Sequence, residues 1–170
     1  MAPRQTGKTT LVNRLLRETD RKICGFSTRK IDELATEEGY CPVYISPVGE
    51  EPVIDDDYCL GLCGKGRHYT NPKAFDEAGV EFLTCSDPDT LIIMDEVGFL
   101  ELEAEKFKAR IFECLASENP VLLMLKERMD IDFLRRIRDF EGVEFIQMTE
   151  QNREEVYKHV KEAYISSLCL

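Results

Sequence analysis

Short runs of apolar residues alternate with amphipathic segments through the second half of the chain, and this alternation is the strongest constraint on the fold. The run Leu91 to Met94 is continuously apolar, which suits a strand buried on both faces of a sheet. Because helices alternate with strands, we expect an α/β fold with a mainly parallel sheet between helices and right-handed crossovers. Further strands are predicted over 120–125 and 143–148, with helices over 103–117, 131–140 and 152–167.

The first half of the chain combines one helix with shorter β-type segments. Apolar residues recur at helical spacing between Thr9 and Arg17, which predicts an amphipathic helix. Segments 25–28 and 42–46 are predicted to form a hairpin around a Glu38-Gly39 turn, and Asn71 is predicted to cap a short helix over 72–80. The intervening stretch, 48–70, contains four glycines and a proline and is interpreted as a mobile, partly extended loop.

Length and charge limit the kind of protein. A chain of 170 residues is expected to form a single domain over 1–170, and its 43% hydrophobic content is enough for a core. The net charge of −11 argues against nucleic-acid and anionic-membrane partners, because such binding depends on basic side chains. With no apolar run long enough to span a bilayer and no secretory signal, the chain is expected to be soluble and cytoplasmic.

Seven cysteines without a secretory signal argue against a disulfide framework. Cys59 and Cys63 are closely spaced and His68 could add a third ligand, but a structural zinc site needs four. Reduced cysteines serving as small apolar residues are the favoured interpretation.

A phosphate-binding pattern opens the first predicted helix. Gly7 allows backbone N–H groups to approach an oxyanion, Lys8 can reach the terminal phosphates, and the Thr9 hydroxyl can bind Mg²⁺. A chance helix start is the alternative interpretation of so short a match. The residues expected to contact a nucleotide are Gln5, Thr6, Gly7, Lys8, Thr9 and Thr10.

The pattern is incomplete in two respects. Ala2 stands where the first glycine of the loop is expected, and its Cβ can strain the turn. A central apolar strand normally leads into such a loop, but no residues for it precede Met1. We therefore expect the first strand to be missing, or its place to be taken by another segment, because such a domain would need about 8 more residues in front.

An acidic pair provides the chemistry that a phosphate loop requires. Asp95 ends the predicted strand over 91–94, where it can bind Mg²⁺ together with Thr9, and Glu96 can orient the attacking water. The predicted catalytic residues are Glu96 and Lys8. The alternative is that the two carboxylates merely end a strand in solvent.

Five segments in this order resemble the small P-loop nucleoside-triphosphatases, a family with thermophilic and human cancer-related members. They are 7–11, 25–28, 94–101, 120–122 and 149–153, and the block Asp-Glu-x-Gly-x-x-Glu within 94–101 is the most specific. The chain is most similar to a clostridial-type bacterial branch. The resemblance implies a three-layer fold and slow, Mg²⁺-dependent hydrolysis of ATP, GTP and related nucleotides to the diphosphate, with broad base preference. It also implies phosphate binding by Lys8, magnesium binding by Thr9 and Asp95, and water orientation by Glu96.

Other candidates carry weaker signals. Lys126 follows a predicted strand and could face the phosphates, although a surface position is equally compatible. Arg29 and Arg67 are candidates for a charge-stabilising arginine. Asn152 and Arg153 could flank the base or simply cap the last helix. His68 and His159 have no sequence neighbour at catalytic spacing.

Three functions are compatible with these motifs. The first is hydrolysis of a nucleoside triphosphate, the expected partner, by a monomer or weak oligomer. The second is a small-molecule or nucleotide kinase in which the segment 48–70 closes over an acceptor. The third is a nucleotide-binding module whose phosphate loop is too altered for turnover.

Overall fold

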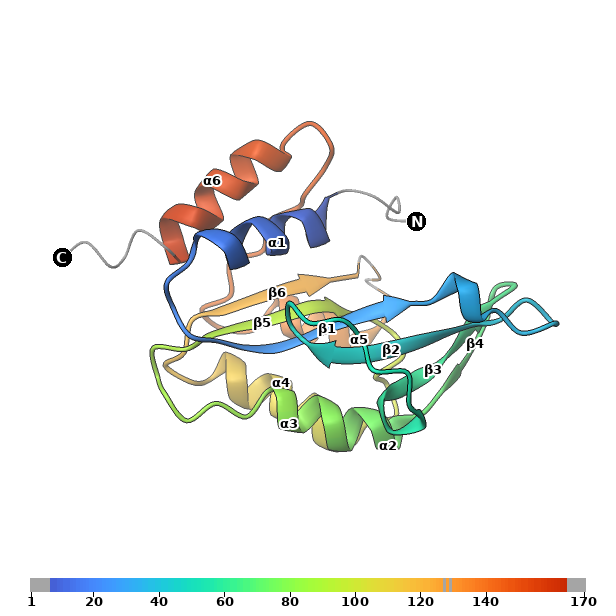
Figure 1. Ribbon diagram of the computed structural model, residues 1–170. Helices are drawn as coiled ribbons and strands as arrows, with labels where there is room; N and C mark the ends of the chain where they lie inside the picture. The colour runs from blue at the N-terminus through green and yellow to red at the C-terminus, as the bar shows by residue number, and fades with distance from the viewer. Residues whose placement is uncertain (1–6, 127, 129, 165–170) are drawn as a thin grey trace.

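A six-stranded sheet lies between two layers of helices in the computed structural model, which describes residues 7–126, 128 and 130–164 (Figure 1). The strands are β1 (Ile23–Lys30), β2 (Cys41–Pro47), β3 (Cys59–Gly64), β4 (Arg67–Thr70), β5 (Leu91–Val97) and β6 (Val121–Leu125). The helices are α1 (Lys8–Glu18), α2 (Pro72–Ala74), α3 (Val80–Phe82), α4 (Glu105–Leu115), α5 (Asp132–Arg138) and α6 (Arg153–Tyr164). A π-helical turn, η3 (Phe75–Gly79), joins α2 to α3, and 3₁₀ turns form η1 (Asp32–Leu34) and η2 (Asp56–Tyr58). The predicted α/β architecture is confirmed.

The sheet has a parallel half and an antiparallel half. Its strand order is β4-β3-β2-β1-β5-β6, with β1, β5 and β6 parallel and the other neighbours antiparallel. Ser27 of β1 aligns with Asp95 of β5. The carboxyl ends of the three parallel strands therefore meet at one edge, where ligands bind in open α/β sheets.

Each face of the parallel half has its own apolar core. Leu91 and Ile93 pack beneath α1 and α6, while Ile92 and Met94 pack against α4, α5 and the helical segment 72–82 (Figure 1). All four side chains are at most 2% exposed. This double burial explains why β5 is continuously apolar rather than alternating.

Several predicted elements are confirmed. The segment expected to be helical between Thr9 and Arg17 lies in α1, and the hairpin predicted from 25–28 and 42–46 is formed by β1 and β2. The Asn71 side chain accepts a hydrogen bond from the Ala74 N–H, which confirms its predicted role as a cap. Within the described part of the chain, no helix is long and apolar enough to cross a membrane.

The interpretation of 48–70 as a mobile loop is wrong in its second half. Residues 59–70 form the β3–β4 hairpin, which extends the sheet on its antiparallel side. Gly61 lies so close to the neighbouring strand that a Cβ would be 1.9 Å from the carbonyl oxygen of Tyr69. Its glycine therefore permits a close approach between strands, so in this segment glycine does not indicate a loop.

The strand predicted over 143–148 does not form. This segment makes no ladder, and Phe145 is 49% exposed. Among the described residues β6 pairs with β5 alone, and its other edge borders a groove of about 940 Å³ that separates it from 143–148. A strand requires a hydrogen-bonded neighbour, and no described strand occupies this position.

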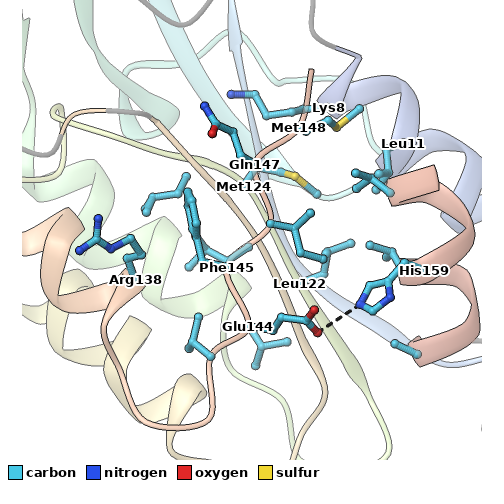
Figure 2. Close-up of a pocket in the computed structure, with 18 of the residues that line it drawn as sticks. Lys8, Leu11, Leu122, Met124, Arg138, Glu144, Phe145, Gln147, Met148 and His159 are labelled. Atoms are coloured by element: carbon cyan, nitrogen blue, oxygen red, sulfur yellow. Dashed lines mark hydrogen bonds and ion pairs between the residues drawn. The ribbon is translucent and has the colours of Figure 1, made fainter. Parts of the chain in front are cut away.

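Apolar side chains of β6 and of the segment 143–148 line this groove. Leu122 and Met124 of β6 face it, Lys8 lies at one end, and the Glu144–His159 ion pair (3.1 Å) lies toward the other (Figure 2). No described strand leads into α1.

The expectation that the cysteines are all reduced is wrong. Cys24 of β1 and Cys85, which follows α3, form a disulfide with their Cα atoms 6.5 Å apart. The two residues are 61 positions apart in sequence, so their proximity is a product of the tertiary fold and could not be inferred from spacing. Among the described residues, no group of three potential metal ligands forms around Cys59 and Cys63, and both are free thiols.

Candidate active site

The phosphate-binding pattern lies at the N-terminus of α1. Gly7 occupies the position before the helix with φ 91°, and its carbonyl accepts a 2.9 Å hydrogen bond from the N–H of Leu11. This left-handed conformation is accessible to glycine without a steric penalty, which explains the need for Gly7. Ala2, Gln5 and Thr6 lie outside the described residues.

Lys8 and Thr9 come together with Asp95. The Asp95 carboxylate at the end of β5 is only 6% exposed, and the Thr9 side chain hydrogen-bonds to it. Burial raises the pKa of Asp95, while the positive charge of Lys8 and the Thr9 hydrogen bond act in the opposite direction. Thr10 is exposed in the first turn of the same helix. The fold thus joins two motifs more than 80 residues apart, as predicted.

Glu96 adopts a strained backbone conformation. Its φ is 78°, a region that residues with a Cβ rarely occupy, and the pairing of β5 with β6 shifts register between Met94 and Val97. The irregularity falls at the carboxyl end of β5, directly after Asp95. Such strain is concentrated at functional sites and costs of order 1–3 kcal/mol.

Lys126 is part of this site. It follows β6, its backbone N–H donates to the carbonyl of Val97, and its Nζ is 2.5 Å from Glu96 Oε1. Of the two sequence-based positions for Lys126, the structure therefore supports the one at the carboxyl edge. The ion pair ties the Glu96 carboxylate to the end of β6.

Glu101 is a structural part of the site, and its role could not be predicted from the motif. Both of its carboxylate oxygens accept from the Gly98 N–H, at 3.2 and 3.1 Å, and the residue is 3% exposed. Burial raises its pKa to about 7. The carboxyl group closes the turn that follows Glu96, which holds the end of β5 in place. In the sequence, Glu101 is marked only as the last residue of the Asp-Glu-x-Gly-x-x-Glu block within 94–101.

Arg153 also approaches the phosphate-binding end of α1. Its Nη1 lies 3.9 Å from the place a Cβ on Gly7 would take, and its Nε donates to the carbonyl of Glu150. Asn152 instead orders the turn before α6, since its Oδ1 accepts from the Thr149 N–H at 2.7 Å. The sequence offers the same two roles for both residues, and the structure distinguishes them. Arg153 lies at the site, whereas Asn152 has a structural role.

The remaining candidates lie in other contacts. Arg29 forms an ion pair with Glu51, and His159 pairs with Glu144. Arg67 and His68 line a separate cavity at the β3–β4 hairpin. The structure does not bring Arg29 or His159 to the Lys8–Asp95 cluster.

The cluster has the donors required for phosphate chemistry. Lys8 and the end of α1 provide positive charge, and Glu96 provides a carboxylate held by Lys126. The Thr9 hydroxyl and the Asp95 carboxylate are adjacent hard oxygen donors, the type that Mg²⁺ prefers.

Comparison with known proteins places the chain in a family. A family model described as NTPase matches residues 2–161. Nucleoside-triphosphatase THEP1 of Thermotoga petrophila is 31% identical over 91% of this chain and 84% of its own length, and the Aquifex aeolicus protein is 22% identical over 91% and 90%.

Two solved structures share the fold. The crystal structure of THEP1 from Aquifex aeolicus has a TM-score of 0.72, with 22% identity and 92% of each chain covered. The solution structure of a human cancer-related nucleoside triphosphatase has a TM-score of 0.64, with 21% identity and 97% and 95% of the two chains covered. From the family match over nearly its whole length, together with the 31% identical relative, it follows that this chain belongs to the NTPase family.

Proposed function

We propose that the protein is a magnesium-dependent nucleoside-triphosphate hydrolase that releases the diphosphate and inorganic phosphate, slowly and with broad base specificity. The observation that carries this proposal is the hydrogen bond of Thr9 to the buried Asp95, with the charge of Lys8 near enough to act on that carboxylate, immediately before the strained Glu96. The names of the related proteins support the same activity.

Each residue has a role that follows from its position. Lys8 and the backbone N–H groups at the start of α1 bind the terminal phosphates, where they offset developing negative charge. Glu96 orients a water molecule for in-line attack and accepts its proton. Lys126 is a positioning residue, because its ion pair holds the Glu96 carboxylate at the carboxyl edge of the sheet.

Thr9 and Asp95 are the residues that would hold Mg²⁺. The bound ion would neutralise phosphate charge and orient the nucleotide. Burial raises the pKa of Asp95, and the positive charge of Lys8 and the Thr9 hydrogen bond act against that shift, as a bound cation would.

Broad base specificity is consistent with a site in which none of these roles is a contact with the base. We further propose that the protein works in the cytoplasm as a monomer or weak oligomer, without nucleic-acid or membrane partners. The net charge of −11 supports the absence of a polyanionic partner.

Phosphate release from ATP, GTP, CTP and UTP tests the proposal. With Mg²⁺ present, wild-type protein should hydrolyse all four, and Lys8→Ala and Glu96→Gln should each reduce kcat by at least about 100-fold, as expected for loss of phosphate stabilisation or water orientation. Lys106→Ala, an exposed change on α4, is the matched control and should retain wild-type rates. Wild-type rates in both site variants would overturn the assignment, whereas tight nucleotide binding without turnover in the wild type would favour a binding module.

A further inference from the structure

A second cavity of about 760 Å³ lies at the tip of the β3–β4 hairpin. It is bounded by the hairpin turn, the end of β1 and the segments that follow β5 and β6. The lining residues that matter here are Lys30, Lys65, Arg67, His68, Phe99 and Arg128. The groove beside β6 is apolar, whereas this cavity is lined with basic groups.

The cavity concentrates positive charge in a strongly acidic protein. Among its described lining residues there are four Lys or Arg side chains and no Asp or Glu, although the chain as a whole carries −11. Lys30 pairs with Asp32, and Arg128 binds both oxygens of Asp130. Within the described residues no ion pair forms at Lys65 or Arg67, and both line the cavity.

The hairpin turn directs Lys65 toward this cavity. Lys65 and Gly66 have φ values of 48° and 73°, which is the conformation of a two-residue hairpin turn that normally favours Asn, Asp or Gly. The Lys65 side chain folds over Gly39, with its Cε 3.3 Å from the place a Cβ would take there. A lysine in this strained position is unfavourable for the turn alone, which suggests that its ammonium group has another use.

An aromatic surface joins the cavity to the candidate active site. The rings of His68 and Phe99 are 4.8 Å apart, and Lys126 Nζ lies 4.7 Å from the centre of the Phe99 ring. Lys126 is also the partner of Glu96. A ligand in the cavity would therefore contact Phe99, whose ring lies against the lysine that positions the proposed catalytic carboxylate.

We propose that this cavity binds a nucleoside monophosphate as a second ligand, distinct from the triphosphate at Lys8. Lys65 and Arg67 provide the charge-assisted donors that a phosphate group requires, and Phe99 with His68 provides a flat aromatic surface for the base. The volume is within the range of small-molecule sites, roughly 300–1,000 Å³. This second site does not depend on whether the protein hydrolyses triphosphates.

Isothermal titration calorimetry with AMP and GMP, without triphosphate, tests the proposal. Wild-type protein should bind one equivalent, and Lys65→Ala/Arg67→Ala should weaken binding by about tenfold or more, which corresponds to loss of about 1.4 kcal/mol. Phe99→Leu, which keeps apolar volume, should weaken both mononucleotides but leave inorganic phosphate unaffected. Lys106→Ala is the control for a general loss of positive charge and should bind as the wild type does.

Three results would overturn the proposal. They are no binding at millimolar mononucleotide, affinity unchanged in the double variant, and affinity abolished by Lys8→Ala, which would place the ligand at the phosphate-binding end of α1. Circular dichroism of each variant confirms that it is folded.

The hydrolysis proposal has a separate readout. Lys65→Ala alone should leave basal triphosphate hydrolysis within about twofold of wild type, whereas Lys8→Ala should abolish hydrolysis and retain mononucleotide binding.

Discussion

Glu101 is the acidic side chain whose environment most affects the response of the protein to pH. It is buried at 3% exposure, and its pKa rises from 4.5 to about 7 because burial disfavours the charged form. Hydrogen bonds from the backbone of Gly98, Leu100 and Glu101 lower the pKa but do not compensate for that desolvation. The turn after Glu96 is thus held by a carboxyl group that is neutral in mildly acidic solution.

The stability of the protein should therefore fall as pH rises from about 4.5 to about 7. In this window the folded state binds more protons at Glu101 than the unfolded state does, so raising pH favours unfolding. A difference of about 2.5 pKa units corresponds to about 3 kcal/mol. Urea unfolding at pH 5 and pH 8 measures the change.

Glu101→Gln provides the matched control for this titration. Glutamine can still accept the Gly98 hydrogen bond but cannot ionise, so the difference in unfolding free energy between variant and wild type should grow from pH 5 to pH 8. A constant difference between the two proteins over this range would show that Glu101 does not titrate there.

At the scale of elements, the free edge of β6 is the least complete part of the fold. Leu122 and Met124 face a groove of about 940 Å³ instead of a neighbouring strand (Figure 2). A strand running parallel to β6 in that groove would end beside Lys8, which lines the same groove at the start of α1.

Joining a six-residue Val/Ile-rich segment ahead of Met1 should stabilise the protein. Burying two or three apolar side chains contributes several kcal/mol, which raises Tm by roughly 5–10 °C for a domain of this size. Calorimetry compares this protein with one that carries a Gly/Ser segment of equal length. An equal Tm for the two would show that the groove does not accept a strand.

The sequence predicts well those elements whose pattern of apolar residues can be recognised within the segment itself. The continuous apolar run of β5 predicts a buried strand, and the helical spacing of apolar residues in α1 predicts an amphipathic helix. The hairpin 59–70 was missed because its glycines allow close approach between strands, a fact visible only when both strands are placed. The segment 143–148 has the composition of a strand, but strand formation depends on a neighbour and not on the segment itself.

The same distinction applies to the site. Lys8, Thr9 and Asp95 were predictable because a motif specifies their chemistry and the alternation of elements brings their ends to one edge. The Lys126–Glu96 ion pair depends on the packing of β6 against β5, and the buried position of Glu101 depends on the turn after β5. Neither has a local sequence signal.

At the scale of the whole molecule, the Cys24–Cys85 disulfide links the first strand to the connection before β5. Closing a loop of 61 residues stabilises the folded state by about 4 kcal/mol in the chain-entropy estimate. Reduction, or Cys85→Ser, should lower the free energy of unfolding by a comparable amount. Urea unfolding with and without a phosphine reductant measures it.

Cys59→Ser is the control for this prediction. Cys59 is a free thiol, so its substitution should leave the response to reductant unchanged, and Cys85→Ser should abolish that response. A wild-type protein insensitive to reductant would contradict a stabilising role for the cross-link.

The net charge acts on the same scale. A chain carrying −11 repels an anionic nucleotide at long range, so attraction must arise locally at Lys8 and the start of α1. The basic cavity at the β3–β4 hairpin is a second place where positive side chains gather in this acidic protein.

The left-handed backbone of Glu96 also shapes how this protein can change by mutation. Glycine would adopt φ 78° without strain, so selection for thermal stability alone would favour Glu96→Gly and remove the carboxylate that the proposed reaction needs. Stability and turnover therefore place opposite demands on residue 96. A thermostable Glu96→Gly variant would be expected to bind nucleotide and release it unhydrolysed.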